Sequence, residues 1–446
     1  MPTIHPSSLR IHPLSSPLNA TVRVPGSKSL TNRALLIAAL ANGTTRLTNA
    51  LFSDDSHHFA NALETLGFDI QLDEVNHEMT VTGLGGNIPA KRAELFIGNA
   101  GTAARFLSAF LTLGNGKYIL DGEPRMRERP IGDLVEALEQ LGCDIHSMDD
   151  GRQTTDHRPS SIVHRQICPP IKIIANGLAG GKTKIAGDIS SQFLSALLMV
   201  APYAKTPIEI ELTTELNSKP YVDMTIAIMK DFGAQVKRDG YRSFTVPLSN
   251  YQFPITNYAI ESDASAASYF FAAPAICGGT VRVENISRKS VQGDIGFLDV
   301  LKQMGCVVEE ADNSITVHRP SSIVGIDVDM RDIPDTAQTL AAIAPFADSL
   351  TRIRSIASAR VKETDRVHAT CMELARLGVR VEEHEDGMTI YPVEKMRPAV
   401  IQTYNDHRMA MAFSLIGLRF DGVTIENPAC VSKTFPNFFD VLEVLR

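Results

Sequence analysis

The apolar positions of the chain form a pattern that recurs six times: an apolar helical stretch ending in glycine, then a strand of alternating apolar and polar residues. The clearest copies are residues 62–70 and 137–145, which read Ala-Leu-Glu-Thr-Leu-Gly-Phe-Asp-Ile and Ala-Leu-Glu-Gln-Leu-Gly-Cys-Asp-Ile. The others cover 228–236, 300–308 and 373–381, and a last copy starts at Asp440. Glycine is typical of the position after the last helical turn because it adopts the left-handed conformation without steric penalty.

A second group of predicted helices lies between these copies, and each follows small or polar residues. Their starts fall at 26–28, 98–102, 190–192, 262–265, 335–337 and 404–408. Six units over 446 residues give about 74 residues per unit, which exceeds the roughly 20–50 residues of solenoid repeats. We therefore expect an α/β fold of compact globules, in which apolar helices cover mixed sheets.

The six units divide naturally into two domains of three units. The first domain is expected to be the continuous segment 26–257, and the second to combine residues 1–25 with 258–446. The longest interval between the helix-ending glycines contains a polar insertion at 149–170, which is typical of a surface loop.

Composition and charge restrict the class of partner. The net charge is −8 and no three consecutive residues are Lys or Arg, which argues against nucleic acid and anionic membranes as partners. No apolar run approaches the roughly 18 residues of a transmembrane helix. The six cysteines form no C-x-x-C pair and no metal-ligand spacing, so we expect free thiols, no metal site and a cytoplasmic protein.

The stretch from Pro25 to Arg33 combines a strand end, a turn and a helix that continues to Leu40. Lys28 and Arg33 fall in the first two helical turns, where unpaired N–H groups already carry partial positive charge. Two extra cations there favour a bound anion. The alternative is an ordinary capped helix whose Lys and Arg lie on the surface.

Two further stretches allow similar chemistry. Residues 98–105 place two glycines at a strand-to-helix turn, which permits close backbone approach to a ligand, although a tight turn without a ligand is equally typical. Residues 123–130 hold three Arg just before a predicted helix. Arg suits bidentate contacts with carboxylate or phosphate, and the alternative is a solvated charged loop.

The stretch 360–366 carries the densest charge. On a helix start, Lys362 and Arg366 would lie four residues apart on one face with Glu363 beside them. Either this is a surface ion-pair ladder, or Arg366 binds an anion and Glu363 is an acid/base group tuned by its cationic neighbours.

Three other positions complete the set. Asp335 follows Ile333-Pro334 and is by default an N-cap carboxylate, but a site rich in cations needs a base. His407 is expected to be structural or orienting, and Lys433 adds a cation before the last helix. Together the motifs predict small, multiply anionic substrates and proton transfer by Lys, Asp and Glu.

The same stretches resemble, in order, the 5-enolpyruvylshikimate-3-phosphate synthase family of enolpyruvyl transferases, from about Val24 to Phe439. The motifs are Pro-Gly-Ser-Lys-Ser (25–29) with Asn32 and Arg33, Gly-Asn-Ala-Gly-Thr (98–102), Arg-Pro-Ile-Gly (129–132), Ser-Ser-Gln (190–192), Ser-Lys-Pro-Tyr (218–221), Arg-Val-Lys-Glu-Thr-Asp-Arg (360–366) and Asn-Asp-His-Arg-Met-Ala (405–410). The resemblance implies two domains of three βαβαββ units in an inside-out α/β barrel-like arrangement, with the active site in the interdomain cleft. It also implies transfer of the enolpyruvyl group of phosphoenolpyruvate to the 5-hydroxyl of shikimate 3-phosphate, with release of phosphate.

The resemblance implies a role for each matched residue. Most of the residues that would bind shikimate 3-phosphate lie in the domain 26–257, and a few lie in the second domain. They are Lys28, Ser29, Arg33, Ser190, Ser191, Gln192, Ser218, Tyr221, Asp335, Ser358 and Lys362. Phosphoenolpyruvate would be bound by Lys28, Gly101, Arg129, Gln192, Arg366, Arg408 and Lys433. Asp335 would take the proton of the 5-hydroxyl. Glu363 and Lys28 would serve in the protonation and deprotonation of the methylene carbon of phosphoenolpyruvate. No cofactor or metal is implied, and we expect a monomer.

Single residues mark departures from the family pattern and argue against rival functions. Phe106 stands where many members have Pro, which bears on inhibition by glyphosate, and Ser358 replaces a family Asn. The sister enzyme acting on UDP-N-acetylglucosamine has a Cys in the loop corresponding to 123–129, where this chain has none. A non-catalytic anion-binding module or an inactive paralogue would be expected to lack Asp335 or Glu363, and both are present.

Overall fold

The computed structural model describes residues 7–148, 167–249, 251 and 256–446. The chain divides into two compact units: the inserted unit, Lys28–Ile260, and the terminal unit, Met1–Ser27 with Glu261–Arg446. The division expected after residues 25 and 257 lies two and three residues from these bounds. Most of the polar insertion expected to form a loop at 149–170 lies outside the described residues.

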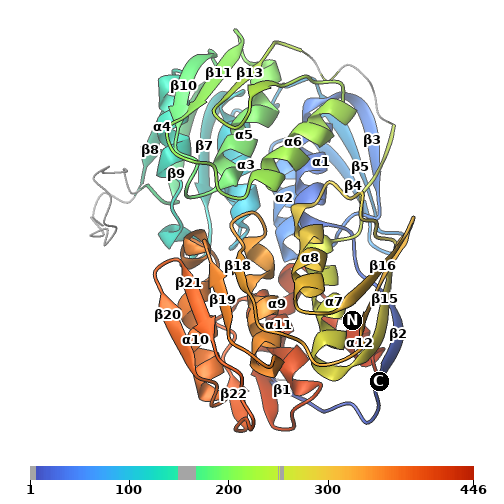
Figure 1. Cartoon of the computed structure of the whole chain (residues 1–446). Helices are drawn as coiled ribbons and strands as arrows, with labels where there is room; N and C mark the ends of the chain where they lie inside the picture. The colour runs from blue at the N-terminus through green and yellow to red at the C-terminus, as the bar shows by residue number, and fades with distance from the viewer. Residues whose placement is uncertain (1–6, 149–166, 250, 252–255) are drawn as a thin grey trace. The chain divides into compact units, whose positions relative to one another are not determined.

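Each unit contains two kinds of helix (Figure 1). The helices of the first kind are α1 (Lys28–Leu40), α3 (Gly101–Leu111) and α5 (Ser191–Val200) in the inserted unit, and α7 (Ala264–Cys277), α9 (Ala337–Ile343) and α11 (His407–Gly417) in the terminal unit. Those of the second kind are α2 (Asp54–Thr65), α4 (Gly132–Gln140), α6 (Lys219–Asp231), α8 (Phe297–Gln303), α10 (Arg366–Arg376) and α12 (Phe438–Glu443). The predicted six pairs of helices are therefore confirmed.

The helices of the first kind form the centre of each unit. In the inserted unit α1, α3 and α5 contact one another, and in the terminal unit α7, α9 and α11 do the same. Every residue of α3 and of α11 is buried, including Arg105 and Arg408. Helices inside and sheets outside give the inside-out arrangement that the resemblance implied.

The sheets repeat one connection pattern. In the inserted unit the strand orders are β14-β3-β5-β4, β6-β7-β9-β8 and β10-β11-β13-β12. These strands are β3 (Asn42–Thr48), β4 (Asp69–Asp73), β5 (Glu78–Leu84), β6 (Arg92–Phe96), β7 (Asn115–Asp121), β8 (Asp144–Ser147), β9 (Ile171–Asn176), β10 (Gly181–Ile185), β11 (Ile208–Leu212), β12 (Lys237–Asp239), β13 (Ser243–Val246) and β14 (Asn257–Ala259). In every sheet the first pair is parallel and the other two pairs are antiparallel.

The terminal unit has the same pattern with one shorter sheet. Its strand orders are β16-β17-β15-β2, β18-β19-β21-β20 and β1-β23-β22. These strands are β1 (Ser8–Ile11), β2 (Leu18–Arg23), β15 (Gly279–Glu284), β16 (Val307–Ala311), β17 (Ser314–Arg319), β18 (Asp327–Asp329), β19 (Thr351–Arg354), β20 (Val381–His384), β21 (Gly387–Ile390), β22 (Ala399–Ile401) and β23 (Val423–Glu426). The N-terminal strand β2 lies parallel to β15, with Leu18 opposite Gly279 and Arg23 opposite Glu284.

The five glycines predicted to end helices all have positive φ: Gly67 (96°), Gly142 (83°), Gly233 (88°), Gly305 (99°) and Gly378 (84°). This conformation disfavours any residue with a Cβ, which explains why the pattern keeps glycine at each position. Among the described residues, no helix is long and apolar enough to span a membrane.

Candidate active site

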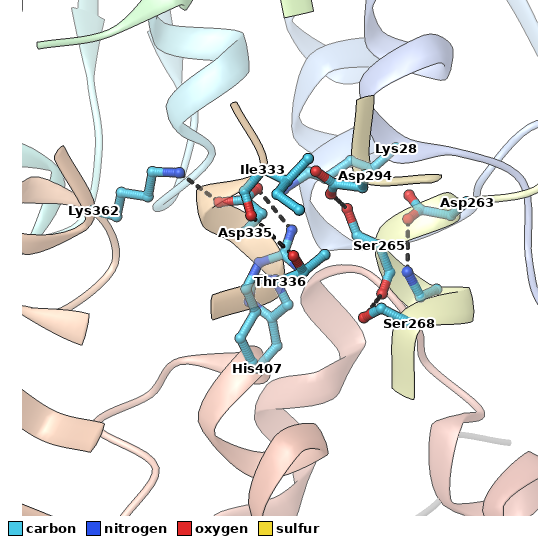
Figure 2. Close-up of polar contacts among 12 residues, drawn as sticks. Lys28, Asp263, Ser265, Ser268, Asp294, Ile333, Asp335, Thr336, Lys362 and His407 are labelled. Carbon is cyan, nitrogen blue, oxygen red and sulfur yellow. Dashed lines mark hydrogen bonds and ion pairs between the residues drawn. The ribbon is translucent and has the colours of Figure 1, made fainter. Parts of the chain in front are cut away.

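Asp335 is the centre of a charged cluster in the terminal unit. Its carboxylate accepts hydrogen bonds from Arg366 Nη1 at 3.1 Å and Arg408 Nη2 at 2.8 Å. It also pairs with Lys362 Nζ, as Figure 2 shows. We call the group of Asp335, Lys362, Glu363, Arg366, Asp406 and Arg408 the Asp335 cluster. It gathers residues from 335 to 408, a span of 73 residues, which is about the length of one repeat.

Two local predictions about this cluster were wrong. Asp335 is not an N-cap, because it lies inside a short 3₁₀ helix, Pro334–Thr336, and Thr336 precedes α9. Lys362 does not share a helix face with Arg366, because α10 begins at Arg366 and Lys362 follows another 3₁₀ helix, Ala357–Val361. The two cations meet through Asp335, so the surface ion-pair ladder is excluded.

Arg366 is held by three carboxylates and is only 3% exposed. Besides Asp335, it contacts Asp406 through Nε at 2.7 Å and Glu363 through Nη2 at 2.8 Å. Asp406 also caps α11 by accepting the backbone N–H of Arg408 at 2.9 Å. Asp406 therefore holds the guanidinium of Arg366 and the backbone of Arg408, and Glu363 reaches Lys433 Nζ at 4.0 Å on its other side.

Charge and burial set the protonation of the cluster. Burial alone would raise the pKa of Asp335, but the charges of Arg408, Lys362 and Arg366 hold it well below its usual value. Burial lowers the pKa of Lys362, although Asp335 opposes this effect. Asp335 is consequently ionised at neutral pH as long as the three cations remain beside it.

A second buried carboxylate lies near this cluster. Asp294, in the 3₁₀ helix Gly293–Gly296, accepts a hydrogen bond from Ser265 Oγ at the start of α7 (Figure 2). Burial, followed by the negative charge of Asp335, raises its pKa to about 6. The sequence motifs do not include Asp294, because no spacing marks it as a neighbour of residue 335.

In the inserted unit, Arg33 is 1% exposed rather than on the surface. Its guanidinium donates to Thr225 Oγ1 at 2.7 Å and to the backbone oxygens of Ser29 at 3.0 Å and Tyr221 at 3.3 Å. Burial lowers the pKa of Arg33 to about 10, with a smaller opposing effect from Tyr221. The alternative of a surface cation is thus wrong for Arg33.

Lys28 and Arg129 are held by different partners within the same unit. Lys28 Nζ lies 3.4 Å from the buried carboxylate of Asp55, on the first turn of α2. Arg129 is 6% exposed and donates from Nη1 to the backbone oxygen of Asn99 at 3.0 Å. The other Arg residues of that stretch form exposed ion pairs, so the solvated-loop alternative holds for Arg125 and Arg127 and not for Arg129.

Gly101 lies directly against the guanidinium of Arg129. A Cβ at Gly101 would lie 2.3 Å from Nη2 of Arg129, so any larger residue would displace this side chain. Arg105, one turn later, donates to the backbone oxygens of Gly101 at 3.2 Å and Pro130 at 2.7 Å. It therefore joins the turn to the segment that carries Arg129, a role that sequence spacing alone did not assign.

The remaining predicted residues lie at helix starts. Ser190 caps α5 by accepting the N–H of Gln192 at 3.3 Å, and the Gln192 side chain reaches Thr102 Oγ1 at 3.3 Å. Ser218 precedes α6 in the left-handed conformation, with φ of 57°. Ser191 is the first residue of α5, and Ser358 lies half-buried in the 3₁₀ helix before Lys362.

These arrangements suit the binding of anionic substrates. Buried Lys and Arg present N–H groups in both units, and the carboxylates beside them can move protons. Among the described residues, no group of three His, Cys, Asp or Glu side chains is placed to hold a metal ion. Asp55 and Asp406, which pair with Lys28 and Arg366, were not among the predicted site residues, although both lie at helix starts, where Asp is common.

Comparisons with known proteins agree with this chemistry. The sequence model of the family "EPSP synthase (3-phosphoshikimate 1-carboxyvinyltransferase)" matches residues 14–442. A 3-phosphoshikimate 1-carboxyvinyltransferase of Sulfurovum sp. is 50% identical over 427 residues, covering 96% of each chain. One of Trichormus variabilis is 48% identical and covers 97% of each. The structure of EPSP synthase from Acinetobacter baumannii matches with a TM-score of 0.79 at 25% identity, covering 98% of each chain. This chain belongs to the EPSP synthase family.

Proposed function

We propose that the chain transfers the enolpyruvyl group of phosphoenolpyruvate to the 5-hydroxyl of shikimate 3-phosphate, using the residues assigned below. The observation that carries the residue assignment is the Asp335 cluster, in which Asp335 lies within hydrogen-bond distance of Arg366 and Arg408. Such a cluster offers a base and two guanidinium groups in one place. A phosphate or carboxylate group would add to it as a further partner of the arginines.

The anionic groups of the substrates are assigned to the buried cations. Arg366, Arg408 and Lys433 of the terminal unit, together with Lys28, Gly101, Arg129 and Gln192 of the inserted unit, bind phosphoenolpyruvate. Shikimate 3-phosphate is assigned to Lys28, Ser29, Arg33, Ser190, Ser191, Gln192, Ser218 and Tyr221, with Asp335, Ser358 and Lys362 on its ring side. Charge-assisted hydrogen bonds of this kind are about twice as strong as neutral ones, which suits substrates carrying several negative charges.

The proton transfers are assigned to three residues. Asp335 accepts the proton of the 5-hydroxyl as its oxygen bonds to C2 of phosphoenolpyruvate, while the methylene carbon gains a proton to give a tetrahedral intermediate. Glu363 and Lys28 serve this protonation and the later deprotonation that accompanies loss of phosphate. When the substrate's negative charge engages Arg366 and Arg408, their hold on Asp335 weakens, its pKa rises, and it becomes a stronger base.

A phosphate-release assay tests the function directly. The purified chain is mixed with phosphoenolpyruvate and shikimate 3-phosphate, and phosphate is followed with time. Release that requires both substrates is expected; release with UDP-N-acetylglucosamine in place of shikimate 3-phosphate would favour the sister enzyme instead. Inhibition by glyphosate, a monomeric state and a cytoplasmic location stay predictions, to be tested by inhibition kinetics, sedimentation and fractionation.

A further inference from the structure

Arg33 is a buried cation without a buried anion. All the hydrogen-bond acceptors around it are neutral, namely Thr225 Oγ1, Ser195 Oγ and the backbone oxygens of Ser29 and Tyr221. Within the described part of the chain it forms no ion pair with a carboxylate. A guanidinium removed from water without a counter-charge is costly, so other groups must stabilise it.

The ring of Phe106 supplies such a group. The Cζ atom of Arg33 lies over this ring, 5.2 Å from its centroid, within the range of a cation–π interaction. Phe106 is on α3, is completely buried and packs against Phe59 of α2 with ring centroids 6.5 Å apart. The ring is therefore fixed by packing, and its electron-rich face is held towards the guanidinium.

Arg33 in turn connects two places assigned to shikimate 3-phosphate. Its Nη1 and Nη2 groups bind the backbone oxygens of Ser29 and Tyr221, which belong to α1 and α6. The four hydrogen bonds use four of the five N–H groups of the side chain, which leaves one on Nη1. A shift of the guanidinium would displace both helix starts.

We propose that Phe106 is a positioning residue for shikimate 3-phosphate, acting through the face of its ring on Arg33. The proposal rests on the assignment of Arg33, Ser29 and Tyr221 to this substrate. It implies that affinity for shikimate 3-phosphate depends on the electron density of the ring at position 106 and not only on its shape. Affinity for phosphoenolpyruvate depends on it much less, because among the described residues Arg33 is the cation placed over this ring.

Fluorinated phenylalanines test this dependence without changing the shape of the core. Phe106 is replaced site-specifically by 4-fluoro-, 3,5-difluoro- and 3,4,5-trifluorophenylalanine in the full chain. The Kd of shikimate 3-phosphate is measured without phosphoenolpyruvate, and KM is measured for both substrates. We expect the Kd of shikimate 3-phosphate to rise with each added fluorine, by about three- to tenfold over the series. The KM of phosphoenolpyruvate should change by less than about twofold.

Phe110 provides the matched control. It lies one turn further along α3, is also completely buried, and contacts Phe68 rather than a cation. The same fluorinated series at Phe110 should leave the Kd of shikimate 3-phosphate unchanged, with similar effects on Tm. Equal responses at the two positions would reduce Phe106 to a packing role and overturn the proposal.

The variant Arg33→Lys separates this inference from the proposed function. A large rise in the Kd of shikimate 3-phosphate for Arg33→Lys, with a flat fluorinated series at Phe106, would overturn the role of Phe106 and keep the assignment of Arg33. An unchanged Kd for Arg33→Lys would overturn the assignment of Arg33 itself. Catalytic activity of the unmodified chain is measured first, so that loss of the whole function is recognised independently.

Discussion

Arg33 and Arg366 are two guanidinium groups buried to nearly the same degree, 1% and 3% exposed, but in opposite electrical surroundings. In the inserted unit, Arg33 has neutral acceptors and an aromatic ring, and burial lowers its pKa to about 10. In the terminal unit, Asp406, Glu363 and Asp335 outweigh the effect of burial and raise the pKa of Arg366. Arg33 therefore has no carboxylate as a counter-charge among the described residues, whereas Arg366 already has three.

The difference indicates two ways of preparing for an anionic substrate. A cation without a counter-ion gains most from an incoming anion, so it should contribute mainly to affinity. A cation already paired must share its hydrogen bonds with the substrate, and this sharing changes the charge felt by the carboxylates. Such a cluster is better suited to proton transfer, because the substrate itself alters the pKa of Asp335.

The largest expected effect concerns the carboxylates of the terminal unit. Glu363→Gln preserves size and hydrogen bonding but removes the proton-carrying group, so kcat should fall by about 10²–10⁴-fold. The Kd of shikimate 3-phosphate should barely change, because Glu363 is assigned to the methylene carbon. Asp335→Asn should also slow turnover, and in addition it should weaken the binding of shikimate 3-phosphate. Near-normal turnover of Glu363→Gln would show that Lys28 or Lys433 carries the proton alone.

Replacing Arg33 or Arg366 by Met tests how each arginine's surroundings affect the free energy of unfolding. Arg366→Met leaves Asp406 and Glu363 buried without their cation and should lower the free energy of unfolding by about 3–5 kcal/mol. Arg33→Met removes an uncompensated charge, and its effect should stay within about 1 kcal/mol. Both values come from urea unfolding at pH 7. Equal losses would remove the contrast between the two sites.

Asp294 makes the stability of the terminal unit depend on pH between about 4 and 6, with the higher stability at the acidic end. Its folded-state pKa, about 6, exceeds its ordinary value of 3.8, so between these pH values the folded protein holds a proton that the unfolded chain has lost. Its contribution to the free energy of unfolding is therefore lost as pH rises from about 4 to 6, by at most roughly 3 kcal/mol. The stabilisation from Asp335, whose folded pKa is depressed, is lost only as pH falls below this window.

Asp294→Asn should therefore flatten this dependence. Urea unfolding of both proteins at pH 4, 5, 6 and 7 should show the variant gaining stability relative to the original chain up to about pH 6. Parallel pH profiles would mean that Asp294 is ionised throughout.

The smallest of these effects concerns single phosphoenolpyruvate contacts. Arg129→Ala or Arg408→Ala should remove a charge-assisted hydrogen bond worth roughly 1.5–3 kcal/mol, raising the KM of phosphoenolpyruvate by an order of magnitude or more. Arg125→Ala is the matched control for Arg129, since Arg125 forms an exposed ion pair with Glu128. A KM unaffected by Arg129→Ala would withdraw its assignment as a ligand.

The sequence predicted the repeats well, because their signals are local. Apolar periodicity and the glycines at 67, 142, 233, 305 and 378 depend only on neighbouring residues, and all five glycines have the expected positive φ. The family motifs were likewise sufficient to identify the enzyme. Signals between neighbouring residues were therefore enough to predict the fold class.

The partners within the site were not predictable from spacing. Lys362 and Arg366 lie four residues apart, which suggested a common helix face, but the helix begins only at Arg366. Asp406 pairs with Arg366 across 40 residues, and Arg33 meets the ring of Phe106 across 73. Such contacts depend on how distant repeats pack, and a single sequence contains no local signal for them.

The pairing of β2 with β15 has a consequence for synthesis of the protein on the ribosome. Arg23 ends β2 and Gly279 begins β15, so the parallel partner of β2 is translated 256 residues later. At about 5–20 residues per second, this interval is roughly 13–50 s, long enough for the inserted unit to fold first. The nascent chain meanwhile presents β2 with an unoccupied edge, which is where a chaperone or a neighbouring chain would compete with β15.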